Sequence, residues 1–190
     1  MPEEEKRDSN IFSVVREGEE NILKINFISS HYSPSIEDSS STFSLVIDAL
    51  VENPDVHRII FQARRNYVYD YKQTQILLEI SNIYKFLIKQ KKILSLSLLS
   101  GIPGLDFYYS SWRNNLQNIV INLLRSDPIG AYVELKRLIR EEKISTKKSS
   151  AKEEIDLRTK YLQILEYLFT LLDETALINF VKDNLSGHII

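Results

Sequence analysis

The chain has 190 residues, a formal net charge of −2 and 43% hydrophobic residues. This length and apolar content suffice for one sizeable core, since domains usually have about 100 to 200 residues. The chain has no cysteine. That absence excludes disulfides, thiolate nucleophiles and cysteine-ligated zinc or iron–sulfur sites.

Charge and hydropathy along the chain indicate its compartment. Residues 1–10 are charged rather than apolar, so we expect no secretory signal. No window reaches the roughly 20 apolar residues that are needed to cross a bilayer. We therefore expect a cytoplasmic protein, one that can still lie peripherally against a membrane partner at the inner face of the cell membrane.

The net charge conceals an asymmetry between the two parts of the chain. Residues 1–56 hold 12 acidic and 4 basic side chains, whereas residues 57–190 hold 14 acidic and 20 basic ones. Such polarity indicates either docking between the two parts or a basic surface offered to an acidic partner. Two ordinary solvated faces are the commoner reason for such a pattern, because charge runs usually only keep helices soluble.

The N-terminal third predicts a small α+β unit. Residues 11–15 and 22–27 are short β-rich runs around a charged, glycine-containing turn, which is typical of a hairpin. A serine-rich loop at 29–41 leads into apolar residues at helical spacing, which end at Asn53-Pro54. The β-branched run VHRIIFQA then predicts a third strand.

From Tyr71 onward the apolar period is that of helices. One stripe predicts a helix of about 20 residues ending near Lys92. The following stretch, ILSLSLLSGIPG, fits either a buried segment or a short strand. Later stripes predict a helix around Trp112, which we expect to be buried, and a helix that Asp127-Pro128 begins. Two more helices are expected in 153–190, the second of them ending at a Gly187 cap.

The predicted fold class is therefore α+β and mainly helical: a hairpin plus one strand, followed by a helical bundle. We divide the chain into an N-terminal unit at 1–66 and a helical core at 67–142. The cationic stretch KISTKKSSAK at 143–152 has no apolar face, which indicates a surface linker or a fraying helix end. The C-terminal helices at 153–190 are expected to join the same core.

The sequence offers no recognisable catalytic motif. A phosphate-binding loop needs several glycines followed by a lysine, but the only close glycine pair, Gly101 and Gly104, has no such lysine after it. Each histidine, His31, His57 or His188, lacks an i, i+4 partner to share a metal. We therefore expect no enzyme activity, catalytic residue, cofactor or metal in this chain by itself.

The charged pairs and clusters fit surfaces better than chemistry. Sequence neighbours such as Glu141-Glu142 and Glu153-Glu154 point in different directions on a helix, and we interpret them as solvated surface. The exposed cations are the candidate interaction residues: Arg64, Arg65, Lys91, Lys92, Arg137 and Arg140. Arg64-Arg65 beside the tyrosine-rich NYVYDY could contact phosphates and bases, although nucleic acid is an unlikely partner at a pI near 6.0.

One resemblance supplies a functional expectation. The string RSDPIGAYVELKRLIREEK, preceded by SSWRNNLQNIVINLLR, resembles the region before the motor core in archaeal secretion ATPases of the type II/IV family. The segment NYVYDYKQTQILLEI is similar as well, so that the resemblance spans roughly residues 45–190. It implies a hexameric RecA-like motor after this region, with ATP and magnesium bound there and not here.

The resemblance implies a role rather than a catalytic residue. An N-terminal domain of this kind helps to form the ring, moves against the motor and docks on the membrane platform protein of a pilus or secretion system. Its partners would be its own motor domain, neighbouring subunits and that platform. The alternative is a free-standing helical adaptor. A weaker alternative is a nucleic-acid-binding module that uses Arg64, Arg65, Lys91, Lys92 and the 143–152 stretch.

Overall fold

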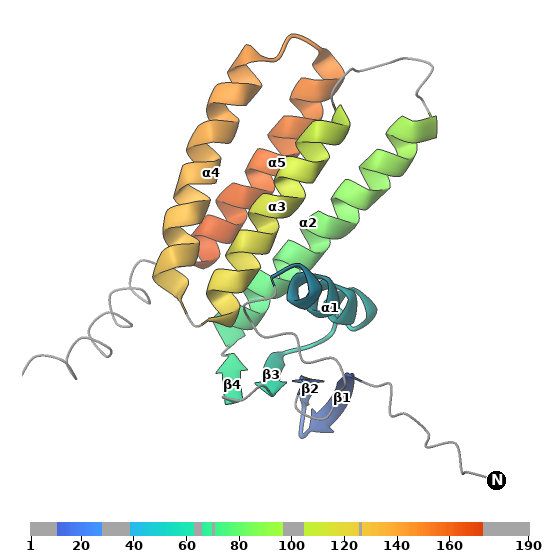
Figure 1. The fold of residues 1–190 in the computed structure, drawn as a ribbon, viewed down its shortest axis with the longest axis vertical. Coiled ribbons are helices and arrows are strands. Elements are labelled where there is room, and N and C mark those ends of the chain that lie inside the picture. Colours follow the sequence, from blue (N-terminus) through green and yellow to red (C-terminus); the bar gives the residue numbers. More distant parts are fainter. Residues whose placement is uncertain are drawn as a thin grey trace, which may run out of the picture.

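The computed structural model describes residues 11–27, 39–62, 66–69, 71–96, 105–125 and 127–172. Its elements follow the order β1, β2, α1, β3, β4 and then four consecutive helices (Figure 1). The fold is α+β and mainly helical, as predicted. Residues 29–38 of the expected loop at 29–41 lie outside the described residues. The expected last helix and its Gly187 cap lie outside them as well.

The four strands form one small mixed sheet in the order β1-β2-β3-β4. The hairpin strands β1 (Phe12–Glu17) and β2 (Glu20–Asn26) are antiparallel. Their turn contains Gly18 at a φ of 64°, a conformation that glycine adopts without steric cost. Strand β3 (Arg58–Gln62) runs parallel to β2, because helix α1 (Ser39–Glu52) carries the chain back across the sheet.

A fourth strand was not predicted. Strand β4 (Asn66–Tyr69) pairs antiparallel with β3, so the sheet is larger than the expected hairpin plus one strand. The Tyr69 hydroxyl donates a buried 2.7 Å hydrogen bond to the carbonyl of Leu124. This bond fastens the sheet to the end of a bundle helix.

The remaining helices form an up-and-down four-helix bundle (Figure 1). They are α2 (Tyr71–Leu96), α3 (Leu105–Leu124), α4 (Pro128–Lys148) and α5 (Lys152–Leu171). Helices α2 and α4 each contact α3 and α5, so they occupy opposite corners of the bundle. Helix α1 crosses the lower end of the bundle beside the sheet (Figure 1).

A single apolar core runs through the sheet and the bundle. It joins Leu23 and Phe61 of the sheet and Val46 of α1 to Leu116 of α3 and Leu165 of α5. Trp112 is also buried, as its stripe position predicted. The described residues after 152 therefore pack on the same core as those before 142.

Two expected boundaries differ from the structure. Residues 143–148 are the last turns of α4, and only residues 149–151 separate α4 from α5. The stretch remains helical because lysine has good helix propensity. Within it, the Thr146 hydroxyl donates a hydrogen bond to the Glu142 carbonyl. Helix α2 likewise continues beyond Lys92 to Leu96, which places the start of ILSLSLLSGIPG in a helix; residues 97–104 lie outside the described part.

Candidate interaction surface

Helix α4 begins in the segment that the sequence singled out. The Asp127 side chain accepts a 2.8 Å hydrogen bond from the Gly130 amide, and Pro128 occupies the first turn. A Cβ at position 130 would lie 2.3 Å from a carboxylate oxygen of Asp127, so a side chain there would shift the Asp127 carboxylate from its present position. The start of α4 is therefore fixed by the predicted pair together with Gly130.

The inner side of α4 is held by a buried ion pair. Arg158 of α5 is only 4% exposed and Glu142 of α4 only 7%. The Arg158 guanidinium donates 2.8 Å to Glu142 and 3.0 Å to Glu154. Its planar group also lies 4.1 Å from the ring centre of Tyr108, a cation–π contact. The expectation that Glu142 is a solvated surface residue is wrong, because its carboxylate faces α5.

Aromatic rings of α3 and α5 pack beside this ion pair. Trp112 of α3 stacks on Tyr161 of α5 with ring centres 4.3 Å apart, and Tyr109 meets Trp112 edge-on at 5.6 Å. Burial raises the pKa of the Tyr161 phenol, and the Glu142 charge raises it further. Burial also raises the pKa of Glu142, although hydrogen bonds from Arg158 and Trp112 oppose this rise. Helices α3 and α5 thus fix the position of α4.

The outer side of α4 carries an exposed stripe of apolar and cationic residues. Its members succeed one another at steps of three and four residues, the spacing of a helix-packing seam. They are three β-branched apolar residues and three cations: Ile129, Val133, Lys136, Arg140, Ile144 and Lys147. We call this set the α4 stripe. Val133 is 59% exposed and Ile144 49%, so the apolar members face solvent.

The cations of the α4 stripe differ from their basic neighbours. Arg137 is held by Glu134 and, at 2.7 Å, by Glu141 of the same helix, and these carboxylates raise its pKa. Lys143 makes a 3.2 Å ion pair with Glu166 of α5. Within the described part of the chain, the three stripe cations have no ion-pair partner. No carboxylate of the described residues therefore neutralises their charge.

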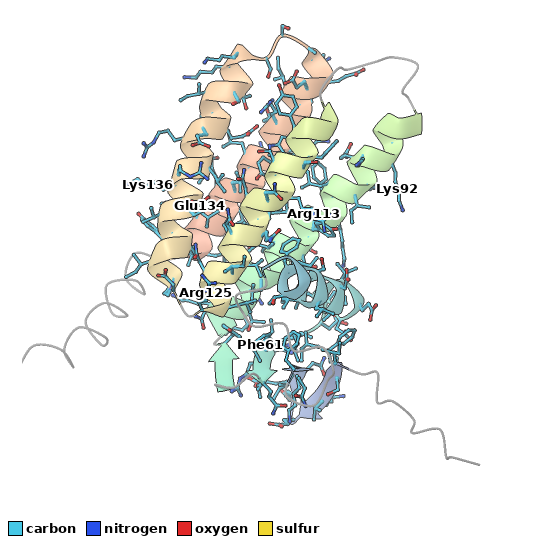
Figure 2. All side chains as sticks on the ribbon, in the orientation of Figure 1. Phe61, Lys92, Arg113, Arg125, Glu134 and Lys136 are labelled. Carbon is cyan, nitrogen blue, oxygen red and sulfur yellow. The ribbon has the colours of Figure 1, made fainter. Side chains whose placement is uncertain are left out.

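The predicted interaction residues do not form one surface. Arg137 and Arg140 lie on α4, whereas Lys91 and Lys92 are exposed on α2 at the opposite corner of the bundle. Figure 2 shows this separation with Lys136 on one side and Lys92 on the other. Arg64 and Arg65 lie outside the described residues. Of the predicted set, only Arg140 belongs to the α4 stripe.

Sequence reasoning placed Arg140 and Arg137 on an outer helix face but missed the apolar members of the stripe. The signal was present, since Ile129, Val133 and Ile144 fall on the same face as Arg140 at helical spacing. Ile144 was placed in the 143–152 stretch, which was interpreted as having no apolar face, and only the structure shows that the bundle buries the other side of α4.

The histidine that the structure describes has a structural role. The Nδ1 atom of His57 accepts a 3.1 Å hydrogen bond from the Asn21 amide, and the His57 amide donates to the Asn21 carbonyl at 2.9 Å. Among the described residues, no cluster of three or more histidine or acidic side chains could hold a metal ion. No described helix is long and apolar enough to cross a bilayer.

Comparisons of the chain with protein-family models, with curated proteins and with solved structures gave no match. The α4 stripe, on a helix fixed by a buried ion pair, is therefore the feature on which a function can be argued.

Proposed function

We propose that this chain is the non-catalytic N-terminal domain of a secretion or pilus-assembly ATPase, acting in ring assembly and in docking to a membrane platform protein. One observation supports this proposal above the others. The segment 125–143 that carries the resemblance coincides with the start and most of α4, the helix with the exposed stripe. Four of the six residues of the α4 stripe therefore lie in one of the segments that carry the resemblance.

The construction of α4 suits a domain that works through contacts. A docking surface gains affinity when it is rigid before binding, because less freedom is lost on association. Arg158 and the aromatic rings hold the inner side of α4, while its exposed isoleucines and valine supply apolar area. Exposed apolar groups of this kind, rimmed by charge, are typical of interaction sites.

The proposal assigns the chemistry to a different part of the protein. ATP and magnesium would be bound by a motor domain that follows this region. The partners of this region would be that motor, neighbouring subunits and a platform protein at the inner face of the cell membrane. The domain itself would lie in the cytoplasm against that face.

The experiment that tests the proposal begins with the coding sequence downstream of Ile190. We expect it to continue into a glycine-rich segment ending in GKT or GKS. The longer protein should hydrolyse ATP with magnesium, whereas residues 1–190 alone should show no turnover above background. A stop codon directly after Ile190 would overturn the proposal and favour the adaptor. Magnesium-dependent hydrolysis by the purified 190-residue chain would contradict its non-catalytic role.

A further inference from the structure

We infer that the α4 stripe is the docking site for an acidic amphipathic helix of a partner protein, which lies antiparallel along α4. This inference rests on the proposed function only in taking the chain to act through protein contacts. It holds equally if the chain is a free-standing adaptor.

The spacing of the α4 stripe points to a helix as the occupant. The six positions advance by four, three, four, four and three residues, so they form one line along α4 instead of winding around it. At 1.5 Å per residue, the line from Ile129 to Lys147 is roughly 27 Å long. A partner helix of about 20 residues would cover this length.

The charge of the α4 stripe selects an acidic partner. Every ionisable member is a cation, and none has an ion-pair partner among the described residues. The glutamates nearest in sequence are directed elsewhere: Glu134 and Glu141 bind Arg137, and Glu142 is buried against Arg158. Carboxylates of a partner would therefore meet Lys136, Arg140 and Lys147 without competition from α4 itself.

The ends of α4 select the direction of the partner. The last turn of α4 holds Lys147 and Lys148, and the carbonyl ends of a helix carry partial negative charge. An antiparallel partner places its N-terminal turn at this point, where acidic side chains are favoured by its own dipole. Read from its N-terminus, the partner would present acid, apolar, acid, acid, apolar and apolar residues to the stripe.

The apolar residues of the α4 stripe argue against two other anionic ligands, a nucleic acid and a membrane surface. A nucleic-acid backbone would set charged phosphates against Val133 and Ile144, where the phosphates would lose water without gaining a hydrogen bond. A helix that lies in a membrane surface carries bulky anchors such as tryptophan, phenylalanine or leucine on its apolar face, and the stripe has none. An amphipathic acidic helix can pack against the apolar residues of the stripe and pair its carboxylates with the cations.

The test uses a designed, fluorescently labelled helical peptide of about 20 residues with the acid–apolar pattern given above. The acidic positions of this peptide are glutamates, and a matched peptide carries lysine at each of them. Binding to the full chain is followed by fluorescence anisotropy. We expect the acidic peptide to bind and its affinity to fall as ionic strength rises, because the contacts are exposed charge pairs. The lysine peptide should bind at least about tenfold more weakly, since like charges then oppose each other.

Charge-reversal variants locate the site. The variant Lys136→Glu with Arg140→Glu should weaken the acidic peptide by about tenfold or more and should gain affinity for the lysine peptide. The matched control, Lys85→Glu with Lys89→Glu, makes the same change of charge on α2 at the opposite corner of the bundle. It should leave both affinities within about twofold, and circular dichroism should show that both variants keep their helices.

Several outcomes would overturn the inference. It fails if the two peptides bind equally, or if the α2 control loses as much affinity as the α4 variant. It also fails if anionic vesicles or single-stranded DNA bind more tightly than the acidic peptide and lose that binding in the α4 variant. The downstream coding sequence decides the proposed function separately, so a stop codon after Ile190 together with specific peptide binding would overturn only the ATPase assignment.

Discussion

Arg158 and Arg137 each hold two glutamates, but one arginine lies inside the bundle and the other in solvent. The Arg158 side chain is 5% exposed and binds Glu142 and Glu154. The Arg137 side chain is 45% exposed and binds Glu134 and Glu141. The number of ion pairs is the same, so any difference in their contribution to stability comes from the surroundings.

The surroundings act through the cost of desolvation. Charges in the interior attract one another strongly, but bringing them there from water offsets much of the gain. Removing one member then leaves a buried charge uncompensated. At the surface, water replaces a lost partner at little cost. The comparison teaches that the packing of the inner side of α4 depends on Arg158 of α5. The outer side does not depend on Arg137 in this way.

The largest expected effect is that of Arg158→Met. This substitution keeps most of the side-chain volume but leaves Glu142 and Glu154 without their cation. We expect the free energy of unfolding at neutral pH to fall by about 3–5 kcal/mol, the cost of breaking a buried pair. Urea denaturation followed by circular dichroism would measure it. A loss below about 1 kcal/mol would show that the buried arginine is no more important than an exposed one.

A second variant separates loss of charge from loss of packing. Adding Glu142→Leu and Glu154→Gln to Arg158→Met removes the uncompensated charges while it keeps apolar contacts with Tyr108 and Trp112. We expect this triple variant to regain at least about half of the stability, because hydrophobic replacements of buried ion pairs are often tolerated. No recovery would mean that the arginine acts through its shape and its cation–π contact.

A smaller effect is expected from pH. Burial raises the pKa of Glu142 above its ordinary value of 4.5, so its protonated form is favoured in the folded chain. The contribution of this group is therefore fully present below pH 4.5 and is lost as the pH rises through its folded pKa. Glu142→Gln removes that loss. Relative to the unsubstituted chain, the variant should thus gain stability as the pH rises above 4.5.

Thermal unfolding of both proteins in matched buffers below and above this pH would check the pH prediction. Glu153→Gln is the control, since Glu153 is exposed on α5 and has no ion pair among the described residues. A difference that moves in the opposite direction would show that Arg158 lowers the pKa of Glu142 more than burial raises it.

The sequence predicted most of the helical architecture because each helix buries a continuous stripe. The Asp127-Pro128 start of α4 was predicted correctly, and so was the burial of Trp112. Strand β4 was missed because it has only four residues, and four residues show too little alternation to distinguish a strand from a helix start. Its pairing with β3 is decided by tertiary contacts.

The candidate site was predicted only in part, for a different physical reason. Arg158 and Glu142 are 16 positions apart on separate helices, and no local pattern reveals which faces of two helices meet. Glu142 therefore looked like a surface residue beside Glu141. The α4 stripe was missed because its isoleucines and valine have the composition of a core, and composition does not state which side of a helix faces solvent.

The smallest expected effect belongs to Arg137→Met, the same substitution on the outer side of α4. Its partners Glu134 and Glu141 remain accessible to water and counterions, so the loss should stay below about 1 kcal/mol. Because salt screens exposed charges, that loss should shrink further at high ionic strength, whereas the loss caused by Arg158→Met should hardly change. Urea denaturation of both variants at low and high salt provides the measurement. If the two variants responded to salt alike, burial could not be the property that distinguishes the two arginines.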